Sequence, residues 1–266
     1  MKKYCIIILA LLFVSAVSRV NAWEITSHFD ADATGGYNYK LYTPDEASAE
    51  NAEALPLVIF LHGASLKGTN LNKVENYGTL DAIHRGLDLP AYVLAPQCQK
   101  SWDSERIMLT VEGVKKACCI DTTRIYVIGM SLGGYGTLNF AAAYPDKVAA
   151  AMGICGGASR DASPLAEVPT YILHGTADNA VSIAKSEKVV EAIKAAGGGS
   201  RLIFKKLPGV NHSRPARFFY CKEVYDWLFA HRLTDEGRPV CRDYDFDNQT
   251  MQDAYKNLPR HGGSVR

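Results

Sequence analysis

The chain carries almost no net charge. Its 266 residues include 29 Lys and Arg and 28 Asp and Glu, which gives a formal charge of +1. No stretch gathers the basic residues into a cluster, so we see no electrostatic reason to expect a nucleic acid as a partner. Internal repeats and low-complexity segments are also lacking, and a hydrophobic content of 47% excludes disordered and collagen-like chains. A chain of this length can bury one large core.

An apolar run long enough to cross a membrane is lacking as well. The longest run, residues 5–17, has 13 residues, and a membrane-spanning helix needs about 20. It follows Met1-Lys2-Lys3 and precedes Val20-Asn21-Ala22, the pattern of a secretory signal peptide. We therefore expect residues 1–22 to be removed. The mature protein would then be exported, periplasmic or extracellular, without stable membrane insertion. Lys2, Lys3 and Arg19 go with this segment, which leaves 26 basic and 28 acidic residues.

The cysteine spacings match no zinc-binding pattern, so we expect neither a metal nor another cofactor. Removal of the signal peptide leaves six cysteines, and most are expected to be buried thiols. Export makes disulfides chemically possible. Cys221 and Cys241 flank the last predicted helix and the tail, so they are the first pair to test. The full set is Cys98, Cys118, Cys119, Cys155, Cys221 and Cys241.

Apolar runs alternate with helical patterns along the chain. Residues 37–41 alternate in polarity and predict an antiparallel strand at one sheet edge, whereas continuous apolar runs are typical of parallel strands buried on both faces. The order predicts an α/β fold with a mostly parallel central sheet flanked by helices. The tail, residues 233–266, shows no clear period and could pack on the domain or trail from it. The other predicted strands are 57–61, 91–95, 124–129, 148–155, 170–173 and 201–207, and the predicted helices are 104–119, 133–144, 182–196 and 214–231.

The clearest motif is Gly129-Met130-Ser131-Leu132-Gly133-Gly134. It fits G-x-S-x-G and stands between a predicted strand and a predicted helix, the context of a nucleophile elbow. The glycines allow a sharp turn where neighbouring chains come close. The turn lifts Ser131 to a helix N-terminus, where the helix dipole favours a developing anion. Ser131 is therefore the predicted catalytic nucleophile.

A serine hydroxyl needs a base, and in this context the chain order is serine, acid, histidine. His212 lies in the loop between the last predicted strand and the last predicted helix, so we predict it to be the base. Asp178 directly follows another strand and is the predicted acid, with Asp146 and Asp161 as weaker rivals. His231, in or at the end of the last helix, is expected to be solvated or to cap that helix.

Such a site also needs backbone N–H groups for the oxyanion. One is expected from Leu132, which follows the nucleophile, and the second from Ala64 in His62-Gly63-Ala64-Ser65, after the strand 57–61. His62 precedes the serine in the chain, so the chain order argues for a structural role in holding this loop.

Together these segments resemble the α/β-hydrolase superfamily. More closely, they are similar to secreted feruloyl and acetyl-xylan esterases and to the phospholipase/carboxylesterase-type "predicted peptidase" family. The resemblance covers residues 23–232 and implies the triad Ser131, Asp178 and His212. This chain departs from the family pattern at two positions: Leu132 stands where the family often has Met, and Ser182 where it often has Pro. The matching segments are Gly36-Tyr37-Asn38-Tyr39, residues 57–63, Ala95-Pro96-Gln97-Cys98 with Trp102, residues 129–134, Cys155-Gly156-Gly157, His174-Gly175 with Asp178 and Val181, and Tyr225-Asp226-Trp227-Leu228.

These features predict a secreted serine esterase that forms an acyl-enzyme on Ser131. Its expected substrates are small-molecule or polysaccharide-linked esters, with feruloyl or acetyl esters of plant-type polysaccharide first. Trp102 could bind substrate by stacking on a sugar or aromatic acyl group, or could only pack in its loop. Loops 65–79 and 97–104 are the candidates for the pocket lining. The alternatives are a serine peptidase of the prolyl-oligopeptidase type and a non-catalytic carbohydrate-binding protein on the same scaffold.

Overall fold

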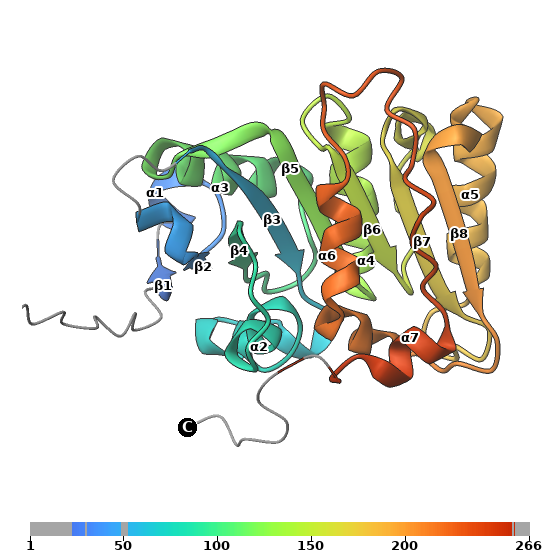
Figure 1. The fold of residues 1–266 in the computed structure, drawn as a ribbon, viewed down its shortest axis with the longest axis horizontal. Helices are drawn as coiled ribbons and strands as arrows, with labels where there is room; N and C mark the ends of the chain where they lie inside the picture. The colour runs from blue at the N-terminus through green and yellow to red at the C-terminus, as the bar shows by residue number, and fades with distance from the viewer. Residues whose placement is uncertain (1–22, 30, 49–52, 257, 259–266) are drawn as a thin grey trace, which may run out of the picture.

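The computed structural model describes residues 23–29, 31–48, 53–256 and 258, which build one eight-stranded sheet (Figure 1). The strand order is β1-β2-β4-β3-β5-β6-β7-β8, and the pairs from β4 to β8 are parallel. The predicted α/β fold with a mostly parallel sheet is confirmed. The strands are β1 Glu24–His28, β2 Tyr39–Thr43, β3 Leu55–Leu61, β4 Tyr92–Pro96, β5 Ile120–Met130, β6 Ala150–Ile154, β7 Thr170–Gly175 and β8 Leu202–Leu207.

The antiparallel strand predicted at the sheet edge is β2, which is the second strand from that edge. β2 pairs antiparallel with β4 on one side and with β1 on the other, so β1 forms the edge. The prediction missed β1 because its five residues are only partly buried and contain no continuous apolar run. Short, half-exposed edge strands are common in natural sheets.

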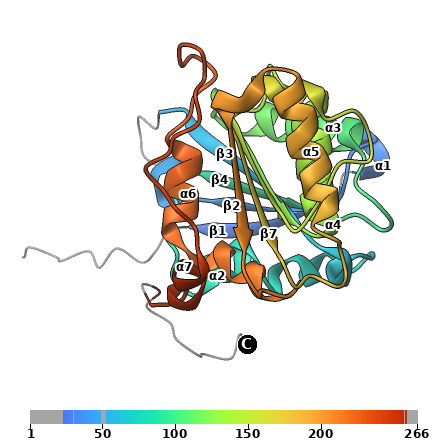
Figure 2. The ribbon, with the colours of Figure 1, turned by 90° about the vertical axis from the view of Figure 1, so that its right-hand side faces the viewer.

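Helices cover both faces of the sheet. Figures 1 and 2 show α3, α4 and α5 on one face and α6 on the other, with α2 and α7 beside the lower edge. The predicted helix 214–231 is divided: residues 214–220 form a 3₁₀ helix with Pro215 in its first turn, and α6 begins only at Lys222. The helices are α1 Ala31–Thr34, α2 Thr79–His84, α3 Ser104–Ala117, α4 Leu132–Ala143, α5 Ala184–Ala195, α6 Lys222–Phe229 and α7 Asn248–Asp253.

The central strand β3 explains how the two layers are held. Leu57, Ile59 and Leu61 point into the core beneath α3, α4 and α5, whereas Val58 and Phe60 point into the core beneath α6. All five side chains have 0% exposure. The continuous apolar run therefore fills both faces of the sheet, as expected for a parallel strand.

The described part of the C-terminal tail packs on the domain. Figure 2 shows it running along the α6 side of the sheet, where Phe246 and Met251 join the core beneath α6. The Arg238 guanidinium donates to the carbonyl of Pro145 at 2.9 Å. His231 is buried rather than solvated: its Nδ1 donates to the carbonyl of Trp227 at the end of α6, and its Nε2 accepts from the backbone N–H of Cys241 in the tail.

The first proposed disulfide is not formed. All six cysteines among the described residues are free thiols. The Cys221 Sγ lies 3.7 Å from the carbonyl of Thr250, while the Cys241 Sγ lies 3.7 Å from the carboxylate of Asp243. Burial raises the pKa of the Cys221 thiol to about 12.

In the part of the chain that the structure describes, we find no helix with the length and hydrophobicity needed to cross a bilayer. The predicted signal peptide, residues 1–22, lies outside the described residues.

Candidate active site

Ser131 stands on a strained turn between β5 and α4. Its backbone has φ 60° and ψ −120°, a conformation that costs a non-glycine residue energy and is typical of functional sites. Its N–H donates to the carbonyl of Ile154 at 2.9 Å, which ties the turn to β6. A Cβ at Gly133 would lie 1.8 Å from the carbonyl oxygen of Leu61, and one at Gly129 would lie 2.5 Å from the carbonyl oxygen of Gly133. Only glycine fits at these two positions, so the sequence pattern is a direct requirement of the turn.

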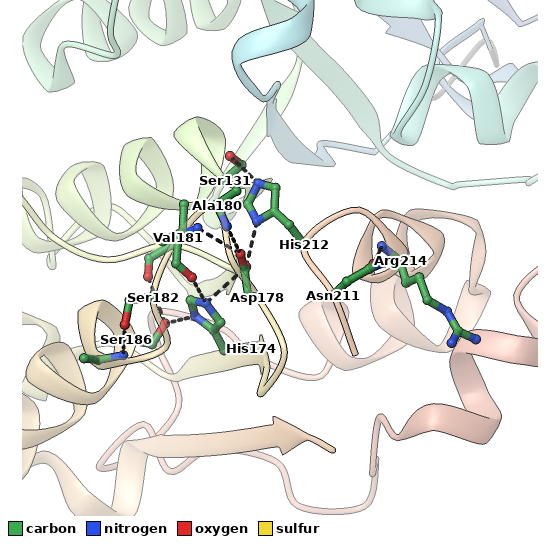
Figure 3. Close-up of polar contacts among 12 residues, drawn as sticks. Ser131, His174, Asp178, Ala180, Val181, Ser182, Ser186, Asn211, His212 and Arg214 are labelled. Carbon is green, nitrogen blue, oxygen red and sulfur yellow. Dashed lines mark hydrogen bonds and ion pairs between the residues drawn. The ribbon is translucent and has the colours of Figure 1, made fainter. Parts of the chain in front are cut away.

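The structure brings Ser131, His212 and Asp178 into one hydrogen-bonded chain (Figure 3). His212 Nε2 lies 2.9 Å from Ser131 Oγ, and His212 Nδ1 lies 2.7 Å from Asp178 Oδ2. Because a carboxylate oxygen can only accept, Nδ1 carries the ring proton and Nε2 is left to accept from the serine hydroxyl. This is the arrangement that activates a serine for attack on a carbonyl.

The Asp178 carboxylate is held in its ionised form. Its side chain is fully buried, which by itself would raise the pKa. The N–H groups of Val181 and Ala180 donate to Oδ1 at 2.8 and 2.9 Å, and the His212 ring donates to Oδ2. These bonds outweigh the burial and hold the pKa of Asp178 below its usual value.

Two helix N-termini converge on the serine. Leu132 is the first residue of α4, and Ala64 is the first residue of a 3₁₀ helix, Ala64–Leu66. The N–H of a first helical residue has no acceptor within its own helix, so both remain available to an oxyanion. A pocket of about 400 Å³ opens beside Ser131 and Ala64, lined by Gly63, Ala64, Ser65, Tyr77, Met130, Ser131, His212, Ser213 and Ala216.

His62 holds the loop that carries Ala64. Its ring is fully buried, Nε2 accepts from the N–H of Cys98 at 3.2 Å, and Nδ1 donates to the carbonyl of Gly63 at 2.7 Å. Burial lowers the pKa of His62 to about 4, so the ring is neutral in this position. The structural role expected from the chain order fits these contacts.

Trp102 lies behind this loop. Its Nε1 donates to the carbonyl of His62 at 3.1 Å, and its ring packs against the His62 ring with a centroid separation of 4.8 Å. It is not among the residues that line the pocket beside Ser131. This position favours the packing interpretation of Trp102 over the substrate-stacking interpretation.

Some residues of the pocket were not expected to line it from the sequence. Tyr77 accepts the N–H of Gly63 on its hydroxyl at 2.8 Å and forms one wall of the pocket, and Met130 and Ala216 line other parts of it. Tyr77 comes from loop 65–79, one of the two loops expected to contribute lining, whereas loop 97–104 contributes none of the residues around the pocket. No local pattern distinguishes Tyr77, because its contact with Gly63 depends on the path of the loop.

The rival acids stand apart from this chain of hydrogen bonds. Asp146 pairs with its neighbour Lys147 at 2.8 Å, and the Asp161 carboxylate accepts from the backbone and hydroxyl of Ser163. Among the residues that the structure describes, one group could hold a metal ion: Cys155 Sγ, an oxygen of Asp178 and a ring nitrogen of His212 lie within 4.8 Å of one another. The Asp178 carboxylate and the His212 ring already share a 2.7 Å hydrogen bond with each other.

The chain resembles known hydrolases in both sequence and structure. Residues 99–228 match the family model of the phospholipase/carboxylesterase family. Poly(3-hydroxyalkanoate) depolymerase C of Paucimonas lemoignei is 28% identical over 139 residues, which cover 45% of this chain and 32% of that protein. A thermostable esterase of known structure is 25% identical with a TM-score of 0.63, covering 79% of this chain and 63% of that one.

A feruloyl esterase module from Clostridium thermocellum, solved with sinapinate, is 16% identical with a TM-score of 0.59 and covers 77% of this chain and 87% of that one. This last likeness concerns the fold alone. The chain spans about a third of the length of the depolymerase and under two thirds of the thermostable esterase. Together with the fold, these likenesses are consistent with a member of the α/β-hydrolase superfamily, and the matching model, that of the phospholipase/carboxylesterase family, covers just under half of the chain.

Proposed function

We propose that the protein is an exported serine esterase that hydrolyses carboxylic esters through an acyl-enzyme on Ser131. The observation that carries this proposal is the hydrogen-bonded chain Ser131–His212–Asp178, with distances of 2.9 and 2.7 Å, at the mouth of a pocket of about 400 Å³. The family match and the thermostable esterase support an ester as the substrate. Export rests on the signal-peptide pattern of residues 1–22.

The geometry accounts for each step of ester hydrolysis. Ser131 Oγ attacks the ester carbonyl carbon while His212 Nε2 takes the hydroxyl proton, and the N–H groups of Leu132 and Ala64 stabilise the resulting oxyanion. Collapse of the intermediate breaks the bond to the alcohol oxygen, which receives the proton from His212. A water molecule then gives a proton to His212 and attacks the acyl carbon. Collapse of this second intermediate breaks the bond to Ser131 Oγ, which takes the proton back from His212, and the acid is released. Asp178 stabilises the transient imidazolium throughout.

For the substrate we propose acyl esters on plant-type polysaccharide, with a feruloyl or acetyl group. The pocket combines small residues, Gly63 and Ala216, with the flat ring of Tyr77 and the side chain of Met130, a lining that suits an aromatic or short acyl chain. The feruloyl esterase module supports this choice only through its fold. A polyester of hydroxy acids is the second candidate, because the match to a poly(3-hydroxyalkanoate) depolymerase covers 139 residues.

Parallel rate measurements separate these possibilities. We expect Ser131→Ala to lose turnover and fluorophosphonate labelling while keeping its fold, and the exposed Ser200→Ala to keep both. Wild-type rates should be compared on methyl ferulate, acetyl-xylan, 4-nitrophenyl acetate, poly(3-hydroxybutyrate) and an aminoacyl anilide. Wild-type ester turnover in Ser131→Ala would overturn the nucleophile. Faster anilide than ester hydrolysis would favour the peptidase alternative, and a folded wild type without labelling would favour the non-catalytic one.

A further inference from the structure

A second histidine contacts the acid of the triad. His174 stands near the end of β7 with a fully buried side chain, and its Nε2 lies 3.3 Å from Asp178 Oδ2. This is the same oxygen that accepts the Nδ1 proton of His212 at 2.7 Å. Figure 3 shows the two rings on opposite sides of the Asp178 carboxylate. The mechanism described above gives His174 no part.

The contacts of His174 decide which ring nitrogen holds its proton. Nε2 faces two groups that can only accept, the Asp178 carboxylate and the carbonyl of Val181 at 2.9 Å. Nε2 must therefore be the protonated nitrogen, since otherwise three acceptors would meet without a donor. Nδ1 lies 2.7 Å from the hydroxyl oxygen of Ser186, which also lies 2.9 Å from the carbonyl of Gly156. Groups from three separate segments thus fix the ring.

We propose that His174 is a positioning residue for the triad: its Nε2–H fixes the Asp178 carboxylate against rotation and withdraws part of its negative charge from His212. This inference rests on the proposed function. With His174 in place, Oδ1 accepts from two backbone N–H groups, and Oδ2 accepts from the His212 ring and lies 3.3 Å from His174 Nε2, whose hydrogen bond at 2.9 Å goes to the carbonyl of Val181. Each oxygen is then held from two directions, and the angle of the His212 ring to Ser131 follows from the angle of the carboxylate.

The charge effect has a definite direction. A neutral N–H donor beside a carboxylate lowers the affinity of the carboxylate for a neighbouring proton. Without the N–H of His174, more of the Asp178 charge acts on His212 and stabilises the protonated form of its ring. Burial lowers the pKa of His174, which favours its neutral form. The remaining titratable group facing Asp178 is the fully buried thiol of Cys155, whose pKa burial raises to about 12, so it stays protonated and uncharged over the working range.

Two amide substitutions distinguish this role from simple packing. In His174→Gln the amide nitrogen reaches the position of Nε2 and can still donate to Asp178. In His174→Asn the amide reaches only the position of Nδ1, so it can contact Ser186 but leaves Asp178 without this donor. We expect kcat of His174→Asn to fall on the order of 100-fold with little change in KM, because misplacement of a catalytic group by about 1 Å costs this much. We also expect the acidic midpoint of its kcat/KM profile to move to higher pH.

His174→Gln should restore most of kcat and the wild-type midpoint. Rates are counted per active site by fluorophosphonate titration, so that misfolded protein does not count. If His174→Asn does not fold, Ser186→Ala serves in its place, because the loss of the Nδ1 partner should shift the midpoint in the same direction by a smaller amount. An unchanged midpoint and kcat in folded His174→Asn, or in Ser186→Ala where that variant replaces it, would overturn the proposal. So would equal losses in the Gln and Asn variants. Full activity of Ser131→Ala would instead overturn the proposed function itself.

Discussion

The packing of the tail leads to a large predicted loss of stability from one substitution far from the active site. Phe246 lies in the tail, yet its side chain is only 1% exposed. Its ring centroid lies 5.1 Å from that of Tyr171 in β7 and 6.2 Å from that of Phe218. Phe246→Ala would leave a cavity between the tail and the sheet, and such a change in a well-packed core costs about 3–5 kcal/mol.

This loss is a large part of the total stability of a typical domain, which is about 5–15 kcal/mol. For a chain of this size each kcal/mol lowers the melting temperature by about 2–4 °C, so the expected shift is roughly 6–20 °C. Urea unfolding followed by circular dichroism gives the free energy directly. The matched control is Tyr244→Ala, two residues earlier, where a partly buried aromatic ring at the rim of the same core is removed and the expected cost is smaller, about 1–2 kcal/mol.

A loss below about 1 kcal/mol for Phe246→Ala would refute the reasoning, because it would mean that the tail is not part of the cooperative core. Esterase activity per folded molecule at 25 °C should stay near the wild-type value. Phe246 contacts β7 and the segment of Phe218, and it lines none of the pocket beside Ser131. Equal losses in the two variants would point to a general loosening of the tail instead.

Three further outcomes are expected. Because burial lowers the pKa of His62 from 6.5 to about 4, unfolding takes up a proton between these values. The contribution of His62 to the free energy of unfolding is fully present above pH 6.5 and should fall by about 3 kcal/mol as the pH drops to 4. Urea titrations of the wild type and of His62→Gln should therefore show a difference in unfolding free energy that shrinks by this amount. Ellman's reagent at pH 8 should modify the exposed Cys119 in the native protein and Cys155 only after unfolding, and early modification of Cys155 would contradict its burial. Tyr77→Phe removes the hydroxyl that accepts the Gly63 N–H, so kcat/KM should fall about 10-fold, the effect of roughly one lost hydrogen bond. An unchanged kcat/KM would mean that Tyr77 does not hold the loop of Gly63 and Ala64 in place for the reaction.

The residues of the proposed triad could be found from sequence because their constraints are local. Gly129 and Gly133 are required by backbone contacts under 3 Å, of Gly129 with Gly133 and of both with the carbonyl of Leu61 in β3. Because the two glycines lie only four positions apart, this requirement leaves a short, recognisable pattern around Ser131. Asp178 and His212 each follow a strand, and parallel strands bring their ends to one edge of the sheet. The chain order then leaves few choices.

Other features could not be predicted, since they depend on contacts between distant segments. The 0% exposure of His174 and its place beside Asp178 follow from the packing of α5, which supplies Ser186, against β6, which precedes Gly156. Trp102 was equally compatible with a substrate wall and with packing until its bond to the carbonyl of His62 placed it behind the loop.

The sequence alone was enough to predict the α/β class, the strands of the parallel sheet and the turn that presents Ser131. Hydrophobic periodicity and steric limits on the backbone act over a few residues, so they leave a readable trace. Contacts in the tertiary structure show that β1 extends the sheet edge, that the described part of the tail completes the core, that the six cysteines among the described residues are free thiols, and that Tyr77 and His174 lie beside the proposed triad. Each of these depends on which surfaces meet when the chain folds, and polar or half-buried residues satisfy many such arrangements equally well.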